Sequence, residues 1–269
     1  MLFRRNSWEW EIDNNTFDIV DLDQFKNYKF STLWNLICSI IMNLLHVLLF
    51  CFDIYTCINL LVFNKWTNDE IQPIIPFEIS RWLFSGCILL SIVLIIIDWI
   101  KGVKLYFTRN ISLTYLNSVS RFLWCVKSYK YFCLYNEISP SNFFDKRAFF
   151  IFFTFKSSIA LIFANTPRQV INGLTIVSIF IDGQAETVLQ SLKNLLKVGF
   201  SEKYAVVLLF MFLSFSIWLI FFIEFLWALI LSMFVLPKIH KVHNQSLKQY
   251  ICNLINQNVS NLSRKYHKS

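Results

Sequence analysis

The sequence predicts an all-α integral membrane protein with about four transmembrane helices and with both termini in the cytoplasm. Of its 269 residues, 56% are hydrophobic and 29 are phenylalanine, and the mean hydropathy is +0.51. Two runs of 20 residues, Leu33–Phe52 and Tyr204–Ile223, carry no formal charge. A helix of about 20 apolar residues crosses a bilayer core of roughly 30 Å. With only five glycines and five prolines, the chain lacks the many turn residues of a transmembrane barrel.

The first part of the chain is a polar tail followed by two membrane helices. Residues 1–30 form the tail, in which "NTFDIVDLDQF" alternates hydrophobic residues with aspartates and is expected to be ordered. The first two membrane helices occupy residues 31–99. A short link over residues 64–80, which we expect outside the cell, joins them.

Basic residues set the expected orientation. The segment 100–147 contains eight Lys or Arg residues, and such segments are usually cytoplasmic. The last apolar run, 204–236, precedes a basic tail, 237–269, which we also expect in the cytoplasm. Both termini then lie on one side, so the number of crossings is even. We expect four crossings, and five is the main alternative.

The stretch 148–182 is the hardest to assign. The segment "AFFIFFTFKSSIALIFA" (148–164) is interrupted by Lys156, and "VINGLTIVSIFI" (170–181) is short for a complete span. We expect residues 148–164 to lie at the membrane interface or to re-enter, and the third crossing to follow them. Residues 183–203 then form a second link outside the cell.

Two acidic residues lie inside the apolar spans and are candidates for an ion path. Asp53 belongs to the first helix and Glu224 to the last, and His46 shares the helical face of Asp53. Ionisable side chains are costly in the bilayer and usually face a bundle interior or a water-filled path, so we expect Glu224 to face the interior. Three interpretations remain open for both acids: a cation path, a structural pair or hydrogen-bonded helix contact, and a headgroup-level position reached by tilt.

A polar segment between two apolar stretches is a further candidate. The segment "FANTPRQVINGLT" (163–175) contains a proline, which removes a backbone donor, and a glycine, which allows close approach. An unwound backbone here would line a pore or substrate path, and the alternative is an interfacial turn. The candidate ion-path residues of this segment are Asn165, Thr166, Gln169, Asn172 and Thr175.

The sequence contains no feature that indicates an enzyme, a bound cofactor or a metal centre. Nucleotide-binding, metalloprotease and hydrolase motifs are absent, and the seven cysteines are scattered without zinc spacing. The net charge of +8 is explained by basic segments that face anionic membrane lipid, so we expect no nucleic-acid partner. A glycine-rich potassium filter is also absent, so ion selectivity would need side-chain oxygens, hydroxyls or unwound backbone.

Several stretches together resemble the fungal KCH family of membrane proteins, which are implicated in low-affinity potassium uptake, including during the pheromone response. The similar stretches include "DIYTCINLLVFNKW" (53–66), "TRNISLTYLNSVSR" (108–121), "YKYFCLYNEISPSNFFDKRAFFIFF" (129–153) and "FANTPRQVINGLT" (163–175). The resemblance implies potassium influx across the plasma membrane, with a vacuolar membrane as the alternative location. It also implies a functional link to calcium channels.

Two functions of different classes follow. The first is a channel-like potassium conduit driven by the membrane potential, with K⁺ as the transported ion and no cofactor. The second is a regulatory or adaptor subunit that modulates another ion transporter through the basic segment 100–147. Self-association into a homo-oligomer is compatible with either function. A lipid-modifying enzyme, as a third class, has no motif to support it.

Overall fold

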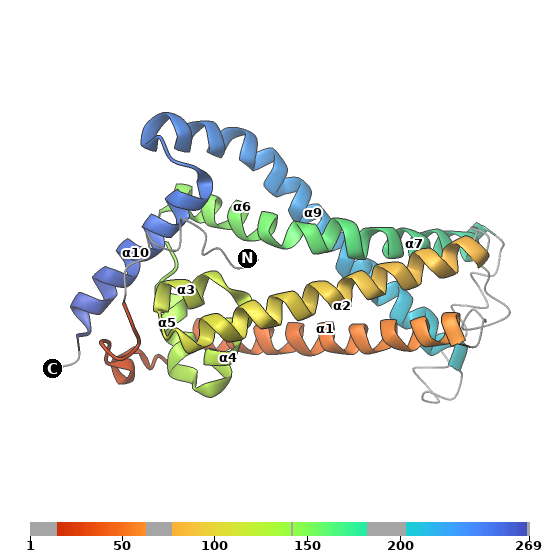
Figure 1. Cartoon of the computed structure of the whole chain (residues 1–269), viewed down its shortest axis with the longest axis horizontal. Helices are drawn as coiled ribbons and strands as arrows, with labels where there is room; N and C mark the ends of the chain where they lie inside the picture. Colours follow the sequence, from red (N-terminus) through yellow and green to blue (C-terminus); the bar gives the residue numbers. More distant parts are fainter. Residues whose placement is uncertain (1–14, 63–76, 141, 182–202, 268–269) are drawn as a thin grey trace, which may run out of the picture. The chain divides into compact units, whose positions relative to one another are not determined.

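The computed structural model describes residues 15–62, 77–140, 142–181 and 203–267, and these ranges are almost entirely helical. The elements, in order, are η2 (Leu22–Phe25), α1 (Phe30–Val62), α2 (Phe77–Phe107), α3 (Ile111–Leu116), α4 (Ser118–Lys127), α5 (Tyr129–Glu137), α6 (Phe143–Ile159), the π-helical turn η3 (Ala160–Asn165), α7 (Thr166–Ile181), α9 (Lys203–His243) and α10 (Leu247–Lys265) (Figure 1). Extended pairing in the described ranges consists of isolated bridges, Thr16 with Asn110 and Val20 with His267.

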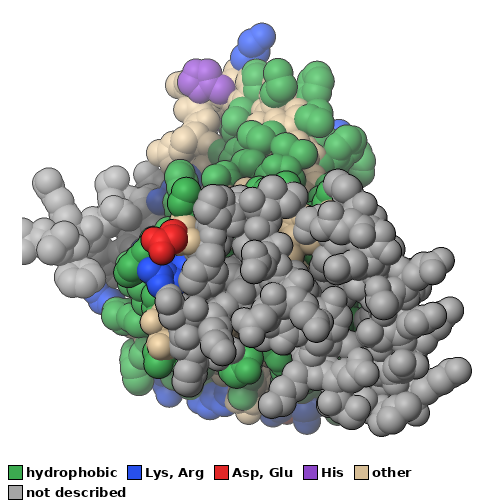
Figure 2. Space-filling view, turned by 90° about the vertical axis from the view of Figure 1, so that its right-hand side faces the viewer, with side chains coloured by type: hydrophobic (Ala, Val, Ile, Leu, Met, Phe, Trp, Pro, Cys, Tyr) green, Lys and Arg blue, Asp and Glu red, His purple; other side chains and the backbone are tan. Residues whose placement is uncertain are grey.

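Four helical segments of the described chain are long and apolar enough to cross a membrane. They are Phe30–Ile58, Arg81–Phe107, Phe143–Val177 and Leu209–His243. Many of their large hydrophobic side chains are exposed, and the described side chains on the face in Figure 2 are mostly hydrophobic. Exposed apolar surface on this scale is expected where lipid is the solvent. The prediction of an all-α membrane protein with four spans is confirmed.

The third span differs from the sequence-based expectation. Residues 148–164 are not separated from the segment after them, because α6, η3 and α7 follow one another without a break. The segment 163–175, expected as unwound backbone, is helical as well. Pro167 lies in the first turn of α7, where its missing N–H costs least. The π-helical turn before it absorbs the irregularity: the Thr166 N–H and hydroxyl both donate to the Leu161 carbonyl, five residues earlier.

The segment after the last span is also more structured than a basic tail. Helix α9 continues through Pro237 to His243. It ends at Asn244, whose φ of 50° is the left-handed conformation common at helix C-termini. Ser246 and Gln249 then form a capping box that starts α10.

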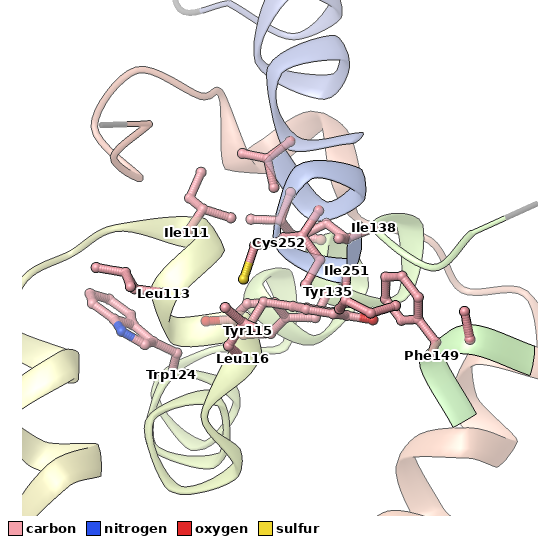
Figure 3. Close-up of a cluster of buried hydrophobic side chains, with 14 of the residues drawn as sticks. Ile111, Leu113, Tyr115, Leu116, Trp124, Tyr135, Ile138, Phe149, Ile251 and Cys252 are labelled. Carbon is pink, nitrogen blue, oxygen red and sulfur yellow. The ribbon is translucent and has the colours of Figure 1, made fainter. Parts of the chain in front are cut away.

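The chain divides into two compact units. The first comprises Met1–Ile40, Ile95–Lys156 and Trp227–Ser269, and the second comprises Ile41–Leu94 and Ser157–Leu226. The core of the first unit combines aliphatic and aromatic side chains from α3, α4, α5, α6 and α10, several of which are labelled in Figure 3. Ile251 and Ile255 of α10 are fully buried in this core.

Short helices of the first unit are fixed by polar caps and one buried hydroxyl pair. The Asn110 side chain accepts from the Leu113 N–H at 3.1 Å and starts α3, and Asn117 caps α4 in the same way. The Tyr135 hydroxyl donates to the Thr114 hydroxyl at 2.9 Å. Burial raises the pKa of Tyr135 above its usual range, so it remains a neutral donor.

The segment before α1 packs onto the same unit. Phe17 is buried against Trp124, with ring centroids 4.5 Å apart. Lys130 contacts Asp23 at 2.5 Å, and this hydrogen bond and charge lower the pKa of the Asp23 carboxyl. These contacts fold residues 15–29 onto α4 and α5.

Gly102 is a point of close approach between α2 and α4. A Cβ added there would lie 2.5 Å from the Val119 Cβ. We expect Gly102→Ala to push the helices apart and to cost about 1–3 kcal/mol, measured as a lower apparent melting temperature of the detergent-purified protein. Gly86→Ala is the matched control, because a Cβ there meets nothing within 4 Å. Equal stability of the two variants would contradict the expectation.

Candidate functional site

The second unit contains a buried ion pair between α1 and α7. Arg168 Nη1 contacts Asp53 Oδ2, and the two side chains are only 8% and 13% exposed. The Arg168 Nε atom is also buried and makes no hydrogen bond within the described residues. A charge held this far from water needs an opposite charge beside it. In the structure Asp53 is therefore a paired carboxylate.

A chain of polar side chains continues from this pair along α7 toward α9. The Asn172 amide donates to the Gln169 carbonyl oxygen at 3.1 Å, and the Gln169 amide donates to the Ser214 hydroxyl at 2.6 Å. Gln169, Asn172 and Ser214 are all buried. One turn earlier on α7, Thr166 accepts from the Trp218 indole at 3.2 Å. Helical spacing brings these groups onto neighbouring faces of α7 and α9.

A cavity of about 40 Å³ lies beside this network. Its polar lining includes Asp53, Thr56, Asn172 and Ser214. The larger part of its wall is apolar and consists of Leu49, Phe52, Phe84, Phe210 and Met211. Because roughly 10–15 Å³ is enough to hold one water molecule, the cavity has room for a small, partly dehydrated ion or a few waters. The polar lining offers carboxylate, hydroxyl and amide oxygens, which are the ligands that hard cations prefer.

The structure brings only part of the predicted site together. Asp53, Gln169 and Asn172 contribute to the ion pair, the polar chain or the cavity. Thr166 lies at the edge of the chain, on Trp218. Asn165 ends the π-helical turn and is half-buried. Thr175 is buried, and its hydroxyl donates to the Ile171 carbonyl of its own helix.

Two predicted residues lie elsewhere. His46 is exposed, and its ring bonds the Met42 carbonyl at 2.7 Å rather than reaching Asp53. Glu224 was expected to face the bundle interior, but its side chain is exposed. Within the described residues no side chain pairs with it. The expectation was wrong because the residues around Glu224 are almost all apolar, so the sequence does not show which face of α9 Glu224 occupies.

Three residues of the site were missed. Arg168 is part of the candidate segment 163–175. Because a charged side chain inside a membrane is energetically costly, an arginine at this position indicates that an acidic partner lies near it. The sequence does not say whether that partner is Asp53 or Glu224. Thr56 and Ser214 gave no signal, because a hydroxyl in an apolar helix usually bonds its own backbone.

Together, the fold and the site define a class: a multi-pass helical membrane protein with a buried polar cluster between its helices. The chain belongs to the KCH family, described as fungal potassium channels. The sequence pattern of this family matches residues 16–258. The motifs that carried the resemblance have structural roles. Asn110 caps α3, Asp145 accepts from the Tyr250 hydroxyl at 2.6 Å, and Arg168 pairs with Asp53.

Two relatives come from Saccharomyces cerevisiae. The chain is 44% identical over 275 residues to low affinity K⁺ transporter 1, covering 98% of this chain and 55% of that protein. It is 34% identical over 225 residues to pheromone-regulated membrane protein 6, covering 76% of this chain and 63% of that protein. The chain thus spans little more than half the length of these relatives. No solved structure matches it.

Proposed function

We propose that the protein conducts potassium at low affinity into the cell across the plasma membrane, driven by the membrane potential. The observation that carries the proposal is the cavity at Asp53, which is lined partly by oxygen-bearing side chains, in a chain of the fungal potassium channel family. The name of the transporter relative supports the same ion. Such a conduit needs no cofactor and no catalytic residue.

The proposed ion path includes Asp53, Asn172 and the Ser214 hydroxyl. Arg168 balances the charge of Asp53, so the polar part of the cavity wall presents neutral oxygens together with a partly neutralised carboxylate. A site of this kind holds a monovalent cation weakly and lets it leave, as conduction requires. We propose that both termini and the basic segment 100–147 face the cytoplasm, in agreement with the distribution of Lys and Arg.

Asn172→Leu is expected to lower rubidium uptake several-fold in cells that lack their own potassium uptake systems. The substitution removes an oxygen from the cavity wall while keeping a side chain of similar size. Thr175→Val is the matched control, because Thr175 is buried on the same helix but does not line the cavity. Uptake is compared at equal surface expression. Equal loss in both variants would indicate a general packing defect rather than an ion path.

A second function, that of a regulatory subunit, is favoured by one observation. Within the basic segment, residues 111–137 form α3, α4 and α5 and contribute to a buried core, as a docking module would. Purified protein in potassium-loaded liposomes separates the two functions. Flux above that of empty vesicles supports the conduit. If the protein supports uptake in cells but gives no flux in liposomes, the regulatory subunit is the better interpretation.

A further inference from the structure

Three cations from three helices of the first unit lie in one neighbourhood, which also contains the carboxylate of Asp98. They are Lys101 of α2, Arg121 of α4 and Lys156 of α6, which we call the basic cluster. The contact between Gly102 and Val119 brings Lys101 and Arg121 into one neighbourhood, because each cation lies one or two residues from that contact. Asp98 lies about one helical turn before Lys101 on α2, and so on the same face.

Two cations of the basic cluster, Arg121 and Lys156, are held in place by their surroundings. The Arg121 guanidinium stacks over Tyr115 and Phe153, at 5.6 and 5.8 Å from the ring centroids. The Lys156 ammonium donates to the Leu116 carbonyl at 2.6 Å. Tyr115 and Leu116, both labelled in Figure 3, are adjacent residues at the end of the short helix α3. A site whose charges are already positioned loses little entropy when an anion binds.

The charges of the cluster are not balanced. Lys101, Arg121, Asp98 and, from α10, Lys248 are all close enough to act electrostatically on the Lys156 ammonium. Asp98 is the only acid in this group, so the neighbourhood is strongly positive. Lys101 and Lys156 are exposed residues, and the Lys156 ammonium itself is part-buried on the Leu116 carbonyl, so an anion can reach the cluster at its exposed edge.

The surroundings indicate where such an anion would come from. Lys101 and Lys156 belong to segments that are apolar enough to span a membrane. Next to Lys101, Trp99, Ile100 and Val103 are exposed and apolar. A soluble anion has no apolar part to place against these side chains, whereas an anionic phospholipid would place its headgroup on the cations and its acyl chains against the exposed apolar residues. We propose that the basic cluster binds the headgroup of an anionic phospholipid.

The test uses the full chain, purified in a neutral detergent and titrated with dioctanoyl phosphatidylserine. The readouts are tryptophan fluorescence and the apparent melting temperature. Dioctanoyl phosphatidylcholine is the uncharged comparison, and inorganic phosphate is the soluble one. We expect phosphatidylserine to bind about ten-fold more tightly than phosphatidylcholine, and inorganic phosphate to give no comparable effect.

Equal binding of the two lipids would overturn the proposal. An equal response to inorganic phosphate would assign the cluster to a soluble anion and would also overturn it.

Two triple variants with the same loss of charge test the location of the site. Lys101→Gln/Arg121→Gln/Lys156→Gln is expected to lose the preference for phosphatidylserine. Lys127→Gln/Lys146→Gln/Lys241→Gln, which removes basic residues of the same unit outside the cluster, is expected to retain it. Equal loss in both triple variants would show non-specific charge attraction and would overturn the proposal.

A variant that gains affinity keeps the test decisive if the cluster variant does not fold. Asp98→Asn removes the acid that acts on Lys156 and is expected to tighten phosphatidylserine binding several-fold. Misfolding cannot produce this gain. Unchanged or weaker binding in folded Asp98→Asn protein would contradict a headgroup at this position.

Discussion

Replacing Arg168 with glutamine is expected to destabilise the protein strongly, because it leaves the buried Asp53 carboxylate without its counter-charge. Removing one partner of a buried ion pair typically costs about 3–5 kcal/mol. The carboxylate cannot turn to bulk water, since its side chain is only 13% exposed. The expected result is a low yield of folded protein and a clearly lower apparent melting temperature after purification.

A second substitution should reverse most of this loss. In Asp53→Asn/Arg168→Gln the pair becomes two neutral amides, which can bond each other without a charge to desolvate. We expect the double variant to be clearly more stable than Arg168→Gln alone. Arg264→Gln, at an exposed position of α10, is the control for losing an arginine as such. A double variant no more stable than the single one would show that the pair is not the cause.

Replacing Ile255 with alanine is expected to cost about 2–5 kcal/mol. Ile255 is fully buried on α10 and belongs to the core of the first unit. Its truncation leaves a cavity in this core, which cannot collapse without moving the short helices that form it. The apparent melting temperature should fall, and limited proteolysis should cleave α10 earlier than in the wild type.

Gln257→Ala is the matched control on the same helix, because its side chain is exposed. We expect little change in that variant, since alanine is a good helix former and no packing is lost. Similar protease resistance of Ile255→Ala and wild type would show that α10 contributes little to the stability of the first unit. Its apolar positions would then need another explanation.

The four spans could be predicted because length and apolar content are properties of the sequence itself. What lies outside the spans was harder to predict. Helix α10 is polar overall, yet Ile251, Ile255 and Val259 recur at four-residue intervals and form its buried face. The four-residue spacing is visible in the sequence of residues 237–269, but the many basic residues of this segment favoured the prediction of a basic tail. The continuous third span was missed because Lys156 and Pro167 resemble interruptions, whereas Lys156 reaches a backbone carbonyl and Pro167 lies in a first helical turn.

The candidate site could be predicted only in part, because the sequence shows which residues are polar but not which residues of different helices meet. The polar residues between 163 and 175 stand out from their apolar flanks, so Gln169 and Asn172 could be identified from composition. The partner of Arg168 could not, because ion pairing across helices depends on the rotation of each helix about its axis. The same rotation leaves Glu224 exposed, and no pattern in its almost uniformly apolar helix reveals it.

The π-helical turn at Ala160–Asn165 has a consequence for any helical wheel drawn through the third span. A π turn accommodates one residue more than an α turn, so every residue after it is displaced by about 100° from the position that a regular helix would give. A wheel fitted to α6 alone would therefore assign Arg168 to the wrong side. A relative with one residue fewer in this turn would have to offer a different side chain to the position of Asp53, even if the rest of its helix were identical.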